Sequence, residues 1–213
     1  ALAISLADFE QVAEQLGVET NAIRAVSTVE SGGRSGFDKS KRPLIRYETH
    51  YFMRLTKGRF NKSHPHLSCA YGTRAYKAAA KNSWASMNEA FALNPDAAVM
   101  SASWGMFQIM GEFYAMGNWP SAQRFAEDMF LSAGQHLRLF FGYCRSTKLS
   151  RHLKTKSWAA FAKGYNGPKY RDNHYDTQMK AAYDRLSGFV KDRLSPKVGG
   201  SRARSPAGSR RRR

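Results

Sequence analysis

The stretch AVSTVESGG, residues 25–33, places a carboxylate in the last turn of an expected helix. Apolar side chains recur at helical spacing before it, at Ile23, Val26 and Val29, and two glycines follow it. A carboxylate at that end of a helix faces the negative pole of the helix dipole, which disfavours its charged form. Glu30 is therefore either a solvated residue at a helix end or a group whose proton has a use.

The bulk composition predicts one globular domain with an anionic partner. A chain of 213 residues with 42% hydrophobic side chains can bury a core without disulfides or metals. Its net charge of +18 favours binding to nucleic acid, a lipid surface or an acidic cell-wall polymer. Seven of the cations lie in residues 194–213, so the remaining chain is itself basic. Two cysteines are too few for a disulfide framework, and a single Cys69–Cys144 bridge stays open.

No membrane-spanning or secretory segment is expected. No apolar run approaches the roughly 18 residues that a spanning helix needs. The first residues, ALAISLADFEQ, carry acids early and have no basic segment, which is not typical of a secretory signal.

The pattern of apolar residues, caps and turns predicts a mainly α fold with one small β element. A capping box of Ser5 and Asp8 opens a first helix that Gly17 closes, and Thr20 is expected to cap the second. PLIRYE, residues 43–48, alternates like a strand of a small hairpin. Further helices are expected at 50–55, 73–93, from Asn94-Pro95, 120–144, 157–166 and 170–190, with a loop at 61–68.

Three short stretches share one character: VESGG at 29–33, SWGMFQIM at 103–110 and GYNGP at 164–168. Each joins a helix end or a glycine turn to a polar residue among apolar ones. Such positions let backbone and polar side chains line a groove while the neighbouring aromatics fill the core.

In this order, and together with the surrounding AIRAVSTVESGG, RPLIRYETHYFMRLT, SASWGMFQIMG and WAAFAKGYNGPKY, these stretches resemble the phage endolysin N-acetylmuramidase family. This family belongs to the goose-type lysozyme and lytic-transglycosylase branch of the lysozyme superfamily. The resemblance covers roughly residues 5–187. It implies a mainly α, α+β lysozyme-like helical bundle with a small β-hairpin beside a catalytic cleft, in a domain of residues 1–190.

The resemblance also implies an activity: cleavage of the β-1,4 bond between N-acetylmuramic acid and N-acetylglucosamine in peptidoglycan, without a cofactor. Protonating the leaving oxygen needs an acid that holds its proton near neutral pH. Glu30 is the predicted general acid, because desolvation and the helix dipole both raise the pKa of a carboxyl in its position.

Glu48, at the end of the expected strand, is the predicted second catalytic carboxylate. It would orient water or stabilise the oxocarbenium ion, or it would only form a structural salt bridge with Arg46 or Arg54. Asp38, in the loop before the strand, is the alternative. If neither serves, the reaction is that of a lytic transglycosylase, which forms 1,6-anhydro ends with one glutamate.

Gln108, Tyr165 and Asn166 are predicted to contact substrate. Gln108 would meet sugar amides or hydroxyls, Tyr165 would hydrogen-bond near Glu30, and Asn166 would bind an acetamido group. A turn-stabilising role is the alternative, since Asn before Gly suits a left-handed turn. The aromatic residues expected in the core are Trp104, Phe107, Trp158 and Phe161.

Two other classes of function compete with this one. His64, His66 and Cys69 are possible zinc ligands, as in phage amidases, but their Pro- and Ser-containing stretch favours a surface turn and no metal. A non-catalytic binding protein directed to the cell wall or to nucleic acid would also use the basic charge. No specific nucleic-acid motif supports the latter.

Residues 191–213 are predicted to form a flexible basic Arg-rich tail that contacts anionic outer-membrane lipid. The chain is expected to be a monomer. The resemblance implies synthesis in the host bacterial cytoplasm and action on periplasmic peptidoglycan, after release through a membrane pore made by another phage protein.

Overall fold

The computed structural model describes residues 3–194 as a mainly helical fold around one small sheet. The α-helices are α1 (Leu6–Leu16), α2 (Thr20–Ser31), α3 (Thr49–Leu55), α4 (Arg74–Lys81), α5 (Ser83–Leu93), α6 (Pro95–Met100), α7 (Ala122–Met129), α8 (Ala133–Ser146), α9 (Ser150–Lys154), α10 (Trp158–Asn166) and α11 (Tyr175–Leu194). The strands are β1 (Ile45–Tyr47), β2 (Ala102–Trp104) and β3 (Ile109–Met110). Short 3-10 helices are η1 (Gly105–Phe107), η2 (Gly111–Gly117) and η3 (Tyr170–Asn173).

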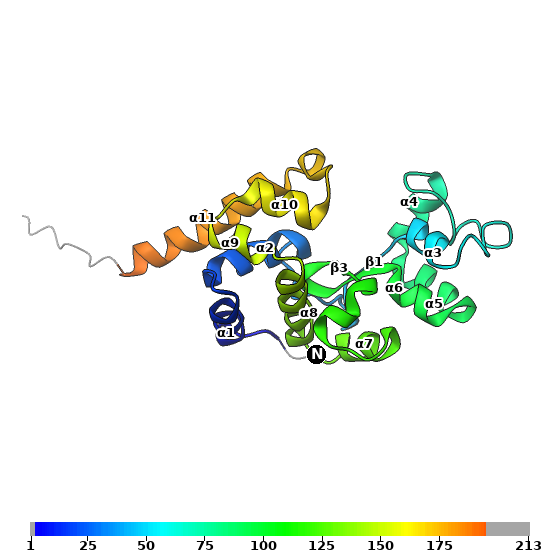
Figure 1. The fold of residues 1–213 in the computed structure, drawn as a ribbon, viewed down its shortest axis with the longest axis horizontal. Coiled ribbons are helices and arrows are strands. Elements are labelled where there is room, and N and C mark those ends of the chain that lie inside the picture. The colour runs from blue at the N-terminus through cyan, green and yellow to red at the C-terminus, as the bar shows by residue number, and fades with distance from the viewer. Residues whose placement is uncertain (1–2, 195–213) are drawn as a thin grey trace, which may run out of the picture.

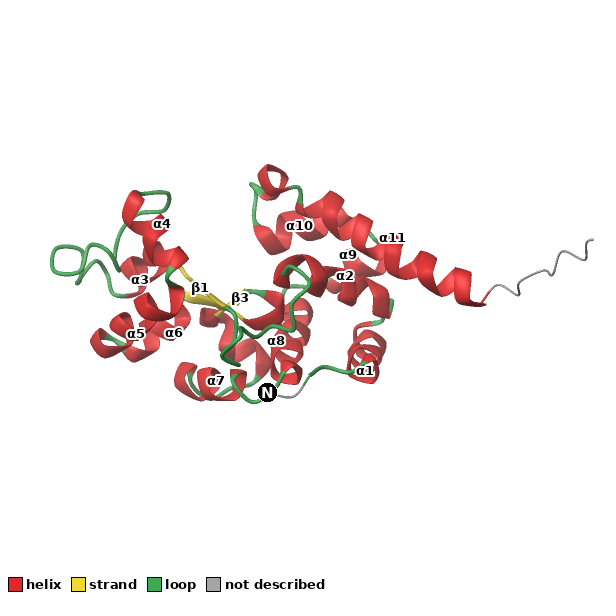
Figure 2. Ribbon diagram, turned by 180° about the vertical axis from the view of Figure 1, so that it is seen from behind, coloured by secondary structure: helices red, strands yellow, loops and turns green. Residues whose placement is uncertain are grey.

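The sheet is antiparallel with the order β1-β2-β3. Arg46 of β1 lies opposite Ser103 of β2, and Ser103 lies opposite Met110 of β3. The sheet lies between two groups of helices, with α3 to α6 on one side and α2 and α8 to α11 on the other (Figures 1 and 2). The predicted mainly α class with a small β element is confirmed, although the expected hairpin is a three-stranded sheet. The strand that pairs with β1 is β2, which follows α6 in the chain. This pairing is a tertiary contact, so the sequence around β1 did not indicate it.

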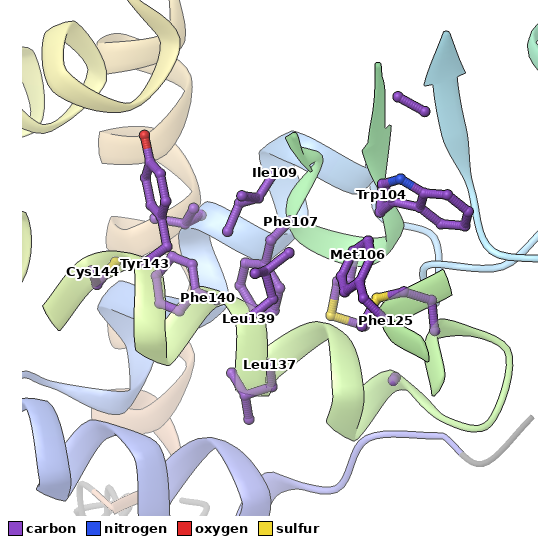
Figure 3. Close-up of a cluster of buried hydrophobic side chains, with 14 of the residues drawn as sticks. Trp104, Met106, Phe107, Ile109, Phe125, Leu137, Leu139, Phe140, Tyr143 and Cys144 are labelled. Atoms are coloured by element: carbon purple, nitrogen blue, oxygen red, sulfur yellow. The ribbon is translucent and has the colours of Figure 1, made fainter. Parts of the chain in front are cut away.

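The hydrophobic core joins the η1 turn to α8. Phe107 stacks on Phe140 with 4.3 Å between ring centroids, and Trp104 lies edge-on to Phe125 at 5.6 Å (Figure 3). The four aromatic residues expected in the core are all buried, which confirms that prediction: Trp104, Phe107, Trp158 and Phe161. The turn that carries Gln108 is therefore packed against buried aromatic side chains.

The first two helices follow their sequence signals closely. The Ser5 hydroxyl accepts from the Asp8 N–H at 3.2 Å, and the Asp8 carboxylate accepts from the Ser5 N–H at 2.8 Å, which confirms the capping box. The predicted Thr20 cap is wrong, because Glu19 is the N-cap residue and Thr20 is already helical. Gly32 closes α2 in the left-handed conformation, with φ of 61°.

Two long expected helices are each divided. The segment 73–93 breaks at Asn82, whose side chain favours turns over helix interiors, into α4 and α5. The segment 120–144 breaks after α7, and Ser132 begins α8 in an extended conformation. Both helices pack on η2, while α7 also packs on α6 and α8 also packs on α1, and these tertiary contacts override the helix propensity of the linking residues. The predicted single helices are therefore wrong, whereas the cap at Asn94 is confirmed.

The last helix differs at both ends from the expected 170–190. Residues 170–173 form η3, and α11 continues to Leu194. The predicted basic tail, 191–213, lies outside the described residues apart from these first four positions of its backbone. In the described part of the chain, no helix is both long and apolar enough to cross a membrane. Cys69 and Cys144 are free thiols, and burial in α8 raises the pKa of Cys144.

Candidate active site

Glu30 is carried into a cleft by the C-terminal turn of α2. Ile23 and Val26 of the same helix are fully buried, which fixes its rotation. The helix then stops abruptly, because the Gly33 N–H donates to the Thr28 carbonyl at 2.8 Å. The Glu30 side chain is thus fixed by a packed helix and is only partly exposed.

The surroundings of Glu30 favour a protonated carboxyl. Burial raises the pKa of Glu30 to about 7, and one hydrogen bond, donated by Asn166 Nδ2 to Glu30 Oε1 at 2.8 Å, opposes that shift. Among residues 3–188, whose side chains the structure describes, no Lys, Arg or His forms a salt bridge with this carboxylate. An acid with this pKa can donate a proton near neutral pH.

A cavity of about 570 Å³ opens in front of Glu30. All of the residues predicted for catalysis or substrate binding line it: Glu30, Glu48, Gln108, Tyr165 and Asn166. They come from α2, β1 and its end, the η1 turn and α10, so the three sequence stretches and the strand meet at one place. Their roles stay predictions, but the structure brings them together.

Glu48 occupies the junction between β1 and α3. Arg46 Nε donates to its Oε1 at 2.9 Å, and its Oε2 lies 3.5 Å from His50 Nδ1. Of the two alternative salt-bridge partners, Arg46 is therefore the one used, whereas Arg54 pairs with Glu112 at 2.6 Å. The Glu48 side chain is 12% exposed and still lines the cavity, so the ion pair does not remove it from the site.

Gln108 stands in a strained backbone conformation and uses its amide within the protein. Its φ of 49° is in the left-handed region, which is uncommon for a residue other than Gly. Its Oε1 accepts from Ser103 Oγ at 2.9 Å, and its Nε2 donates to the Gly105 carbonyl at 2.8 Å and to the Leu44 carbonyl at 3.3 Å. These bonds hold the β2–β3 turn beside the cavity.

Tyr165 and Asn166 end α10 and divide their tasks differently from expectation. The Tyr165 hydroxyl donates to the Phe107 carbonyl at 2.6 Å, which ties α10 to the η1 turn. The bond to Glu30 comes instead from Asn166. Burial raises the pKa of the Tyr165 phenol well above its ordinary value, so it stays a neutral donor.

The other candidates lie elsewhere. Asp38 accepts hydrogen bonds from Ser40 and Arg42 of its own loop, and it lines a different cavity from Glu30. His66 Nε2 lies 2.8 Å from a Glu89 carboxylate oxygen. Among the described side chains, up to residue 188, no group of three or more His, Cys, Asp or Glu residues could hold a metal ion. The possible zinc ligands His64, His66 and Cys69 do not form such a group.

Several cavity residues escaped the sequence analysis. Arg46 was considered only as a salt-bridge partner, although strand alternation puts residues 46 and 48 on one face and could have found it. Tyr71 and Tyr76 come from the loop before α4 and from α4 itself, and no sequence signal points to them. Lys169, Asn173 and Tyr175 follow the GYNGP turn closely enough that its position could have indicated them.

Comparison with known proteins agrees with this geometry. A model of the N-acetylmuramidase family matches residues 19–187. The crystal structure of the Burkholderia AP3 phage endolysin is similar, with 32% sequence identity and a TM-score of 0.77, over 87% of this chain and 72% of that chain. A search of proteins with curated descriptions found no match. The predicted resemblance is confirmed: the chain belongs to the N-acetylmuramidase family, a family of glycoside hydrolases.

Proposed function

We propose that this chain hydrolyses the β-1,4 bond between N-acetylmuramic acid and N-acetylglucosamine in peptidoglycan, with Glu30 as the general acid. The observation that carries the proposal is a partly buried carboxyl, with its pKa raised to about 7, on the wall of a 570 Å³ cavity. Near neutral pH a large share of the molecules then hold the proton that the leaving oxygen needs.

The first step is proton transfer from the Glu30 carboxyl to the glycosidic oxygen. As the glycosidic bond breaks, positive charge develops on the sugar carbon in an oxocarbenium-like transition state. The Asn166 amide bonds one oxygen of Glu30 and so fixes the direction of the acid. The hydrogen bond from Asn166 also stabilises the Glu30 carboxylate that is left after proton transfer, and so it favours that transfer.

Glu48 is the second carboxylate of the proposed reaction. Its charge would stabilise the oxocarbenium ion or direct the attacking water. Arg46 holds one of its oxygens, and His50 lies beside the other, so its orientation is fixed before substrate enters. Gln108 and Tyr165 would support substrate contact by shaping the wall around Glu30, since their own polar groups bond the protein.

A lytic transglycosylase is the second candidate, and one observation favours it. Glu48 is already paired with Arg46, so it is less free to activate water than an unpaired carboxylate. In that reaction Glu30 alone would act as acid and then as base, and the sugar's own hydroxyl would close a 1,6-anhydro ring.

Mass spectrometry of the soluble products distinguishes the two. Purified peptidoglycan is digested with the chain, and Glu30→Gln serves as the blank. Reducing N-acetylmuramic acid ends are expected and support the hydrolase. Products lighter by one water, with 1,6-anhydro ends, would replace it with the transglycosylase. Equal release by the Glu30→Gln variant would overturn the role of Glu30 in both.

We also propose that the substrate is met in the periplasm of a Gram-negative host, after synthesis in its cytoplasm. Residues 195–213 contain seven cations and no acid, a composition that attracts anionic lipid headgroups. Ending the chain at Leu194 should spare activity on isolated peptidoglycan and weaken action on intact cells. Equal potency of both forms on intact cells would contradict this use of the segment.

A further inference from the structure

Tyr71 is an exposed aromatic residue at the mouth of the candidate active site. It lies between α3 and α4 and is 65% exposed. Among the side chains that the structure describes, residues 3–188, the other exposed large hydrophobic ones are Leu6, Phe91, Phe130 and Leu131. Tyr71 alone among these five lines the cavity that holds Glu30 and Glu48. A single exposed apolar residue is ordinary, but one that lines a polar cavity is placed to meet a ligand.

The Tyr71 ring is supported from behind in spite of its exposure. Its centroid lies 4.7 Å from the ring of Tyr76 and 5.4 Å from the ring of His50. Tyr76 is itself buried, and its hydroxyl accepts from Arg46 Nη2 at 3.0 Å. A ring braced in this way has less conformational freedom to lose when a ligand covers it, which favours binding.

The same support connects Tyr71 to the second carboxylate. His50 touches the Tyr71 ring on one side, and its Nδ1 lies 3.5 Å from Glu48 Oε2 on the other. Arg46 donates one hydrogen bond to the Tyr76 hydroxyl and another to Glu48 Oε1. Tyr71, Tyr76 and Arg46 therefore form one wall of the cavity together with Glu48, and His50 packs against Tyr71 and lies beside Glu48.

The chemistry of this wall matches a pyranose ring. A sugar presents an apolar C–H face and a rim of polar groups. The aromatic ring of Tyr71 offers an apolar face, while Arg46 and Asn173, which line the same cavity, offer donors to the rim. Tyr76 of α4 and Asn166 of α10 both line the cavity, and these two helices lie on opposite sides of the sheet (Figure 1).

We propose that Tyr71 is a substrate-positioning residue on which one sugar ring of the glycan strand stacks, beside Glu48. The proposal rests on the proposed glycan-cleaving function and adds a binding contact to it. A strand held on this wall is presented to Glu48 in a fixed register, while Glu30 faces it from α2. Tyr71 contributes its ring, not its hydroxyl, so Phe can replace it.

Binding without cleavage gives the direct test. In a Glu30→Gln background, the dissociation constant for peptide-free, soluble peptidoglycan strands is measured by calorimetry. Tyr71→Ala is expected to weaken binding about tenfold, roughly 1.4 kcal/mol, whereas Tyr71→Phe stays within about twofold. Phe91→Ala removes another exposed aromatic side chain, 41% exposed and outside the cavity, and serves as the control, with no change expected.

Two results would overturn the proposal. Unchanged affinity in Tyr71→Ala would do so, and so would absence of measurable binding by the Glu30→Gln parent. An equal loss in Phe91→Ala would show that the effect is not a property of this wall. Because Tyr71 is so exposed, its replacement should leave the melting temperature nearly unchanged, which separates lost contact from lost fold.

A kinetic measurement separates this proposal from the one on which it rests. In the otherwise unchanged chain, Tyr71→Ala should raise KM about tenfold for the same soluble strands and change kcat little. A fall in kcat with an unchanged KM would contradict a stacking role. Should Glu30→Gln remain fully lytic, the role of Glu30 fails, while the KM of Tyr71→Ala in the otherwise unchanged chain still tests the stacking contact.

Discussion

Two glutamates line one cavity, and their surroundings differ in kind. Glu30 ends a buried helix, receives a single amide hydrogen bond from Asn166, and has its pKa raised to about 7 by burial. Glu48 ends a strand and is ion-paired with Arg46 at 2.9 Å, with His50 beside its other oxygen. An ion pair requires the charged carboxylate, whereas burial without a cation favours the neutral acid. The position of one arginine thus separates the two candidate roles.

The largest effect on activity is expected from replacing Glu30. Glu30→Gln keeps the size and hydrogen-bonding capacity of the side chain but cannot donate the proton. Solubilisation of purified peptidoglycan should fall by about 10³-fold, within the usual range for a lost general acid. Glu127→Gln, on the exposed face of α7, is the matched control and should keep full activity. Full lysis by Glu30→Gln with native circular dichroism would remove Glu30 from the mechanism.

A smaller effect is expected at Glu48. Glu48→Gln removes the charge proposed to stabilise the oxocarbenium ion, and activity should fall about 100-fold. Glu112→Gln offers a close control, because Glu112 is also paired with an arginine, Arg54, but lies outside the cavity. Similar losses in both variants, each matched by a lowered melting temperature, would reduce Glu48 to a structural ion pair.

The pH dependence of the reaction sharpens the assignment of the acid. With the pKa of Glu30 at about 7, kcat/KM on soluble strands should decline as the pH rises above that value, about tenfold per unit. Asn166→Ala removes the hydrogen bond that favours the charged form, so the decline should move to higher pH. A decline that stays in place in Asn166→Ala would mean that another group limits the reaction.

The smallest expected effect is on stability, and it is independent of activity. The pKa of Glu30 is about 7 in the folded chain against an ordinary 4.5, so the folded state binds this proton more tightly than the unfolded state. Its stabilising contribution is present below about pH 4.5 and is lost as the pH rises through about 7. The side chain of Glu30→Gln does not titrate. The melting temperature of this variant should therefore rise relative to that of the unchanged chain as the pH increases from 5 to 8. A constant difference across this interval would contradict a buried, titrating Glu30.

Local signals in the sequence predicted much of this fold and pointed to five residues that line one cavity. The capping box at Ser5, the cap at Asn94 and the glycine that closes α2 each act within a few residues, so their pattern suffices. The three polar-and-glycine stretches likewise predicted which residues would gather. Their family resemblance was needed to join them, because no local rule places residue 30 beside residue 166.

The features that escaped prediction depend on distant contacts. The break before α8 separates α7, which also packs on α6, from α8, which also packs on α1, while both helices pack on η2. The bond between Asn166 and Glu30 spans 136 positions, and only the folded chain decides that Asn166, and not Tyr165, makes it. Tyr71 lies in a loop with no periodicity, so its place at the cavity follows from the turns on either side.

The thiol of Cys144 makes the core under this site observable without any added label. It is fully buried in α8, next to Tyr143, and burial disfavours the thiolate that reacts with alkylating reagents. Alkylation of Cys144 therefore requires the core to open. The alkylation rate then depends on how often this opening occurs. With the more accessible Cys69 replaced by Ser, a single alkylation time course would report how often the core between α8 and the η1 turn opens in the native chain.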